Sequence, residues 1–158
     1  MPHFTATRFV AVPAETAYAV ASDVAAYKSF LPLLERSVIR GPVAHVDGVT
    51  QFSAELAVGY AKLGVREAFI SRVTCDAHKR MVTATSRDAP FKEMKTVWSI
   101  TEKPGGCDVS IAIDYAMRNM LVQLAINGAM DMAVQKVMSA FEARALSVDK
   151  ASKTISNA

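Results

Sequence analysis

Residues 108–146 read DVSIAIDYAMRNMLVQLAINGAMDMAVQKVMSAFEARAL, and this stretch decides the fold. Its first part alternates apolar and polar side chains from Val109 to Met117, as a strand does when one face meets apolar matter and the other meets water. From about Asn119 to Leu146 the apolar residues recur at helical spacing, and Asn119 is placed to cap the helix. The stretch predicts a half-buried strand followed directly by a long amphipathic helix.

Turn signals divide the region from residue 35 to residue 117 into short segments. They are Gly41-Pro42, Asp47-Gly48, Leu63-Gly64, Asp76 to Lys79, Asp88-Ala89-Pro90 and Pro104-Gly105-Gly106. Six such signals predict about six strands joined by tight connections, which is typical of an antiparallel meander. The segment 52–60 alternates as clearly as 109–117, whereas the pattern of 65–75 leaves its facing open.

The N-terminal region predicts one further strand and two short helices. Residues 4–12 mix apolar and polar positions as a strand does, Pro13 ends the pattern, and helices over 14–25 and 27–31 follow. A six- or seven-stranded sheet with one apolar face needs a cover, and only the long C-terminal helix is large enough to supply it. We therefore predict an α+β protein whose antiparallel sheet wraps round that helix and leaves a cavity between them.

The composition is that of a single folded domain. The chain has 158 residues and a mass of 17.0 kDa; 51% of its residues are apolar and 21% are charged. Its longest run of apolar residues has five members, from Ala17 to Ala21, whereas a membrane-spanning helix needs about 20. We expect one domain over 1–146, a disordered polar tail over 147–158 and no transmembrane helix.

The charges and the cysteines argue against DNA binding and against secretion. The formal net charge is +3, yet Lys79-Arg80 is the only adjacent basic pair, so the cluster that DNA binding usually requires is missing. Cys75 and Cys107 lie far apart in the sequence without a further cysteine, which favours two reduced thiols over a disulfide. The N-terminus runs straight into strand pattern without the features of a signal peptide. We expect a cytoplasmic protein. Peripheral contact with the inner membrane is a further expectation.

The sequence contains no standard catalytic motif. The histidines are His3, His45 and His78. They lie far apart in the sequence, so we expect no metal site. Acid–base chemistry would need a titratable group in the apolar cavity, and only Glu67 with Tyr60 or Tyr115 could serve. We favour the alternative that Glu67 is a charge on the sheet surface and that both tyrosines line the core, which leaves no catalytic residue.

The methionines gather around the start of the long helix. Five of the eight fall within residues 117–138. Methionine is flexible and polarizable, so it suits surfaces that adapt to variable apolar shapes, although it also fills gaps in ordinary cores. The segment 120–126 is apolar nearly all round, which is more than one buried face requires. This predicts a lid over a ligand, a dimer contact or a membrane contact.

Five stretches in order resemble the coenzyme-Q-binding START-domain family over about residues 3–146. They are SDVAAY (22–27) leading to FLP (30–32), ELAVGY (55–60), REAFISRV (66–73), PFKEM (90–94) with Trp98, and AFEARA (140–145). This family also contains the bacterial ribosome-association toxin A proteins and is often labelled polyketide cyclase/dehydrase. The chain departs from the family pattern at Leu33, where a Trp is usual, and at Ala89, where a Gly is usual.

The resemblance implies a helix-grip fold that encloses a hydrophobic tunnel. It further implies a carrier or chaperone that binds ubiquinone or a similar isoprenoid lipid, supports respiratory electron transfer and requires no other cofactor. The residues that we expect to contact the ligand are Phe30, Leu31, Pro32, Phe52, Leu56, Val58, Tyr60, Phe91, Trp98, Ile113, Tyr115, Met117, Met130, Val134, Val137 and Phe141. The expected partners are the lipid and, transiently, the membrane surface.

Two other functions remain open from the sequence. A ribosome-association regulator would act on the large subunit and block subunit joining. A polyketide cyclase or dehydratase would use the acid–base residues given above. We rank the carrier first, the regulator second and the enzyme third.

Overall fold

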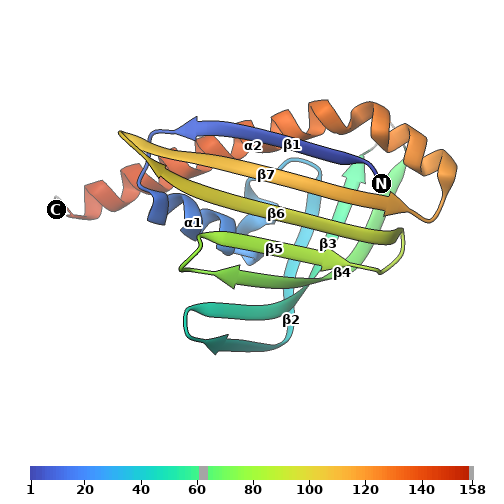
Figure 1. Ribbon diagram of the computed structural model, residues 1–158, viewed down its shortest axis with the longest axis horizontal. Helices are drawn as coiled ribbons and strands as arrows, with labels where there is room; N and C mark the ends of the chain where they lie inside the picture. Colours follow the sequence, from blue (N-terminus) through green and yellow to red (C-terminus); the bar gives the residue numbers. More distant parts are fainter. Residues whose placement is uncertain (61–63, 157–158) are drawn as a thin grey trace.

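A computed structural model describes residues 1–60 and 64–156, and it shows an antiparallel sheet curved round one long helix (Figure 1). The elements are β1 (His3–Val10), α1 (Ala14–Ser22), the 3-10 helix η1 (Val24–Ser29), β2 (Leu34–Val46), β3 (Val49–Tyr60), β4 (Val65–Asp76), β5 (Met81–Ser86), β6 (Phe91–Lys103), β7 (Gly106–Met117) and α2 (Met120–Ser156). The strand order is β1-β7-β6-β5-β4-β3-β2, and every neighbouring pair is antiparallel. The predicted α+β helix-grip fold is confirmed, with seven strands.

The connection from β7 to α2 forms as the sequence predicts. Along β7 the residues of one parity, from Val109 to Met117, lie on the inner face of the sheet, because α2 covers that face. The side chain of Asn119 caps the helix, since its Oδ1 accepts hydrogen bonds from the backbone N–H groups of Leu121 (2.8 Å) and Val122 (3.2 Å). The cap ends the strand and starts the helix within three residues.

The facing of β4, which the sequence left open, is set by its pairing with β3. Phe69, Val73 and Cys75 are buried, whereas Arg72 is exposed on the outer face. Glu67 has the parity of the buried residues and lies directly opposite Val58 of β3, yet it is exposed, because it lies near the end of the strand.

One turn signal marks an irregularity inside a strand. Gly41-Pro42 lies within β2, where the pairing with β3 shifts register between Arg40 and Ala44. Gly41 has a φ of 71°, and proline donates no backbone hydrogen bond. Both are tolerated here because β2 is an edge strand. The six strands of this region therefore need only five connections.

The helices differ from their predicted bounds. The first helix ends at Ser22 rather than residue 25, and the second element is a 3-10 helix that ends at Ser29. Helix α2 continues past the predicted end at Leu146 to Ser156, so the polar stretch 147–156 is helical and the expected disorder there is wrong. None of the described helices has an apolar segment long enough to cross a membrane.

Close packing is concentrated where α1 and the middle of α2 meet the sheet. Phe141 and Met138 of α2 are 1% and 2% exposed, and Phe141 stacks on Trp98 of β6 with ring centroids 4.8 Å apart. Cys75 and Cys107 are buried free thiols in this region. This packed part of the core ends at Trp98, and the cavity begins there.

Candidate ligand-binding cavity

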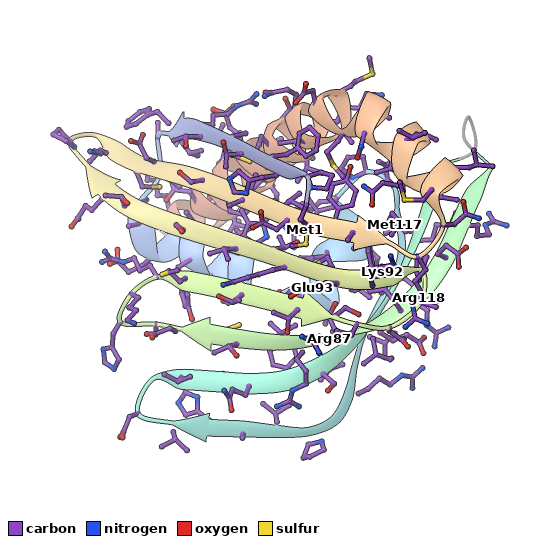
Figure 2. All side chains as sticks on the ribbon, turned by 45° about the vertical axis from the view of Figure 1, so that its right-hand side comes forward. Met1, Arg87, Lys92, Glu93, Met117 and Arg118 are labelled. Atoms are coloured by element: carbon purple, nitrogen blue, oxygen red, sulfur yellow. The ribbon has the colours of Figure 1, made fainter. Side chains whose placement is uncertain are left out.

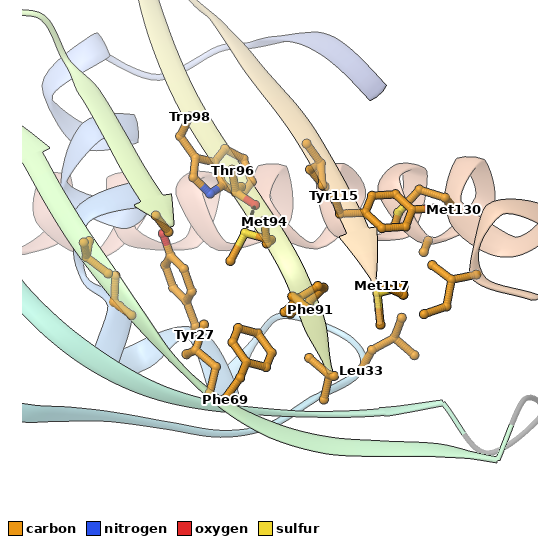
Figure 3. Close-up of a pocket in the computed structure, with 18 of the residues that line it drawn as sticks. Tyr27, Leu33, Phe69, Phe91, Met94, Thr96, Trp98, Tyr115, Met117 and Met130 are labelled. Atoms are coloured by element: carbon orange, nitrogen blue, oxygen red, sulfur yellow. Dashed lines mark hydrogen bonds between the residues drawn. The ribbon is translucent and has the colours of Figure 1, made fainter. Parts of the chain in front are cut away.

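A cavity of about 300 Å³ lies between the inner face of the sheet and the N-terminal half of α2 (Figure 3). Its walls come from strands β3 to β7, from η1, from Leu33 just before β2, and from α2. The lining residues are Val24, Tyr27, Leu33, Leu56, Val58, Gly59, Phe69, Val73, Val82, Ala84, Phe91, Met94, Thr96, Trp98, Ile113, Tyr115, Met117, Ile126, Ala129, Met130 and Ala133. Small residues at Ala84, Ala129 and Ala133 leave the space open, because larger side chains there would fill it.

The walls are almost wholly apolar. They consist of aliphatic and aromatic side chains and three thioethers, and no charged side chain of the described residues lines the cavity. Such a surface binds apolar ligands through the area it removes from water, and it needs no ionic anchor to do so.

Two tyrosine hydroxyls of the lining are already hydrogen-bonded within the protein. Tyr27 donates to the backbone carbonyl of Ala21, and Tyr115 donates to Oδ1 of Asn127. The same Asn127 oxygen accepts from Nε2 of Gln123 at 3.0 Å, which ties the first turns of α2 to β7. Burial raises the pKa of both tyrosines, so both remain neutral donors at neutral pH.

The cavity is elongated along β6. Phe91 begins this strand and lies at one end of the cavity, which we call the Phe91 end; Trp98 lies at the other end, beside the packed core. Seven residues of extended strand place these two side chains roughly 20 Å apart. Leu33, where the family pattern usually has a Trp, lines the cavity and has a φ of 70°.

Half of the residues predicted to contact a ligand line the cavity. These are Leu56, Val58, Phe91, Trp98, Ile113, Tyr115, Met117 and Met130. Four others lie in the packed core instead, because the sheet closes onto α2 there: Phe52, Val134, Val137 and Phe141. Tyr60 ends β3, and its side chain lies outside the described residues.

The predicted mouth residues Phe30, Leu31 and Pro32 lie elsewhere. They line a shallow depression on the outer surface between η1 and α2, not the cavity. The guanidinium of Arg144 covers the ring of Phe30 at 5.3 Å from its centroid. The next residue, Leu33, reaches the cavity from the same turn, so the FLP motif fixes the position of Leu33 without contributing to the lining itself.

Several lining residues were missed although the sequence carries a signal for some of them. Met94 and Thr96 share the parity of Trp98 on β6, so the alternation along this strand would have placed both of them on the same face as the predicted Trp98. Ala129 and Ala133 lie four residues apart on the inner face of α2. Nothing in their local pattern distinguishes small residues that border a void from small residues that permit close packing.

The structure does not bring Glu67 together with Tyr115, one of the two tyrosines considered for acid–base chemistry; the side chain of the other, Tyr60, lies outside the described residues. Tyr115 lines the cavity with its hydroxyl bonded to Asn127, whereas Glu67 is exposed near the end of β4, and no hydrogen bond joins Glu67 to Tyr115. Within the described residues, no three His, Cys, Asp or Glu side chains gather in a group that could hold a metal ion.

The outer surface at the Phe91 end combines exposed apolar side chains with charged ones, and Figure 2 shows Arg87, Lys92 and Arg118 near one another there, with Glu93 beside them. The apolar residues are Met120 (65% exposed), Leu121 (78%) and Leu124 (64%). Arg118 donates from Nε to the carbonyl of Phe91 (2.8 Å) and from an Nη to the carbonyl of Arg87 (2.7 Å), so it holds the 87–91 loop against the start of α2. Arg87 and Lys92 are exposed beside it.

A family model for polyketide cyclase/dehydrase and lipid transport proteins matches residues 10–142. The chain belongs to this family. The family membership predicted from the five sequence stretches is therefore confirmed, and the match covers strands β2 to β7 together with the part of α2 that lines the cavity.

Relatives of this chain carry two different names. It is 26% identical over 149 residues to the ribosome association toxin RatA of Escherichia coli K12, covering 94% of this chain and 89% of that protein. It is 25% identical over 142 residues to the mitochondrial coenzyme Q-binding protein COQ10 of Drosophila melanogaster, covering 87% of this chain and 56% of that protein. Its fold matches a START superfamily protein of Mycobacterium smegmatis with a TM-score of 0.73 at 21% identity, covering 92% of this chain and 98% of that one.

Proposed function

We propose that this protein is a carrier for an isoprenoid lipid, and that ubiquinone is its ligand. The observation that carries the proposal is the elongated cavity of about 300 Å³ with apolar walls. Burying an isoprene unit of five carbons there contributes about 4 kcal/mol before the cost of association. The coenzyme Q-binding name of one relative supports the choice of ubiquinone over other lipids.

The size of the cavity sets how much of the ligand it holds. An apolar cavity of about 150 Å³ in another protein holds a benzene ring, so about 300 Å³ has room for a substituted ring and the first part of a tail. It does not have room for a long tail. A longer tail therefore extends out of the Phe91 end, next to the exposed apolar residues that begin α2.

The same end is suited to contact a membrane. The exposed Leu121 and Leu124 can enter the apolar layer, while Arg87, Lys92 and Arg118 lie where anionic head groups would be. A tail that leaves the cavity here passes directly into the bilayer, so the ligand never crosses water. The proposed membrane contact and the proposed cargo thus support one another.

The carrier proposal is tested by what the protein holds after purification without detergent. We expect solvent extracts, examined by mass spectrometry, to contain an isoprenoid quinone in substantial molar proportion. Ala133→Phe places a ring in the cavity and is expected to remove most of this lipid. Ala143→Phe adds the same ring on the exposed face of α2 and is expected to retain it.

Two results would contradict the proposal. One is the absence of lipid from extracts of the wild-type protein, together with unchanged Trp98 fluorescence when ubiquinone is added. The other is equal lipid recovery from Ala133→Phe and Ala143→Phe, since the ligand would then lie outside the cavity.

A role in ribosome association is the second candidate, and one observation favours it. The chain covers 89% of the ribosome association toxin but 56% of the coenzyme Q-binding relative. If the regulator function applies, overproduction raises the proportion of free ribosomal subunits in sucrose gradients. An unchanged proportion of free subunits rules out the regulator function and does not contradict the carrier function.

A further inference from the structure

Two polar groups of β6 lie in the otherwise apolar cavity, at the end beside the packed core. Thr96 and Trp98 are two residues apart on the strand, so their side chains are on the same face, and both line the cavity. Figure 3 shows the Thr96 hydroxyl and the indole nitrogen of Trp98 on the same stretch of β6. They form the polar end of the cavity.

The hydrogen-bonding capacity of these two groups is largely unused. Trp98 is 5% exposed, yet its Nε1–H donates to none of the described residues. The Thr96 hydroxyl donates to the thioether of Met94 at 3.2 Å, which is a weak acceptor. Among the described residues, Ser71 Oγ is the one fully buried side-chain oxygen or nitrogen without a partner, so the Trp98 N–H is not sealed inside the protein but keeps accessible surface. The hydroxyls of the two cavity tyrosines are paired with oxygen acceptors, whereas this N–H is free for a ligand.

The indole is also held in a fixed orientation. Trp98 stacks on Phe141 with an angle of 24° between the rings, and Phe141 is 1% exposed within the packed core. The direction of the Nε1–H is therefore set before any ligand arrives, which lowers the entropy cost of binding an acceptor. No charged side chain of the described lining accompanies the two donors, so a neutral acceptor suits them.

We propose that Trp98 Nε1–H and the Thr96 hydroxyl together bind a carbonyl oxygen of the ligand. The inference rests on the carrier function proposed above and adds the class and orientation of the cargo. A lipid with a neutral oxygen-bearing head, such as a quinone, enters head first and places its carbonyl beside β6. Its tail then follows the cavity towards the Phe91 end, and a hydrocarbon without oxygen gains nothing from the two donors.

The single tryptophan makes the contact directly observable. The chain has one Trp, so a ¹⁵N-labelled sample gives one indole N–H resonance. We expect this proton to shift downfield on titration with a ubiquinone that carries two isoprene units. An isoprenoid hydrocarbon with the same number of carbons should fill the cavity without that downfield shift.

Variants separate the hydrogen bonds from the packing. Thr96→Val keeps the shape of the side chain and is expected to weaken quinone binding about fivefold, while hydrocarbon binding stays the same. Trp98→Phe keeps a ring against Phe141 and is expected to weaken quinone binding by a similar factor. Thr85→Val, on the exposed side of β5, is the matched control and should change neither affinity.

The outcomes distinguish this inference from the carrier function. Equal affinities for the quinone and the hydrocarbon, with an indole proton that responds alike to both, overturn the hydrogen-bonded anchor and leave lipid carriage intact. Loss of affinity for both ligands in Thr96→Val also overturns it, since the residue would then act through packing alone. Failure of both ligands to bind the wild-type protein overturns both proposals together.

Discussion

Burial is the main influence on the chemistry of the two cysteines. Cys75 of β4 is 4% exposed and Cys107 of β7 is fully buried, and neither forms a disulfide. Burial raises the pKa of the Cys75 thiol from 9.0 to about 11, and it also raises the pKa of Cys107. Because the thiolate is the reactive form, both side chains are inert structural groups at neutral pH.

The raised pKa of Cys75 predicts a loss of stability in alkaline solution. The unfolded thiol loses its proton near pH 9.0, whereas the folded one keeps it to about pH 11. The free energy of unfolding therefore falls as the pH rises between these values, by about 2 kcal/mol for this group. Cys75→Ala removes this contribution, so urea denaturation should show a flatter decline for the variant.

The tyrosines set the upper pH limit of that measurement. Burial raises the pKa of Tyr18 to about 12 and raises that of Tyr27 as well, and the neighbouring Cys75 adds to both shifts, so the comparison is made below pH 10, where the tyrosines do not yet titrate. Parallel curves for the two proteins between pH 9 and pH 10 would contradict the assignment to Cys75.

At the scale of elements, local patterns predicted the facing of β7 and the starts of α1 and α2, but neither the start of η1 nor the ends of the helices. The alternation of 109–117 and the cap at Asn119 were correct because each depends on residues next to one another. The end of α2 was wrong because its last turns are polar yet contain no Gly or Pro. In these last turns, Val148 packs against the core, and Lys153 forms an ion pair with Asp149 at 3.0 Å.

The cavity shows the same limit of local reasoning. Its existence depends on small side chains that meet in space from β5 and α2, and no single segment reveals that meeting. The sequence therefore predicted the kind of lining and half of its residues. It placed Phe141 and Val134 in the lining as well, because the residues of one apolar helix stripe show the same sequence pattern whether they border the packed core or the cavity.

The exposed leucines in the first turns of α2 lead us to expect that substitutions there weaken membrane binding. Replacing both Leu121 and Leu124 with Gln removes two exposed apolar side chains and is expected to weaken binding to vesicles with anionic lipids by about tenfold or more. Vesicle co-sedimentation measures the loss. Leu146, which is 44% exposed on the distant half of the same helix, gives the control variant Leu146→Gln.

The membrane assay also reports on the role of charge. Binding by the wild type should fall as salt is added, because Arg87, Lys92 and Arg118 attract anionic head groups through a screened field. Equal binding by the Leu121/Leu124 double variant and Leu146→Gln would show that the start of α2 is not the membrane contact.

The whole molecule is divided into a packed part and a hollow part that share one sheet and one helix. The packed part, around Phe141, provides stability, and the hollow part, around Met130, provides the space for a ligand. This division explains why α2 is so long: one half is buried against α1 and the sheet, and the other half covers the cavity. Stability and binding can then vary separately.

A matched pair of methionines tests that division. Met138 is 2% exposed in the packed core and Met130 lines the cavity, and the two lie eight residues apart on α2. Met138→Ala is expected to lower the free energy of unfolding by about 2–5 kcal/mol, since it opens a new void among close neighbours. Met130→Ala should cost less than about 2 kcal/mol in the ligand-free protein, because its side chain already borders empty space and loses fewer contacts.

Because both variants exchange the same residue type in the same helix, the change in helix propensity is the same and cancels in the comparison. Urea denaturation of delipidated protein gives both values. Adding the quinone should then raise the stability of Met138→Ala by as much as that of the wild type, through mass action on an intact cavity, and should raise that of Met130→Ala by less. Equal costs for the two substitutions, with equal stabilisation by the ligand, would show that the core is packed uniformly and that the cavity is closed in solution.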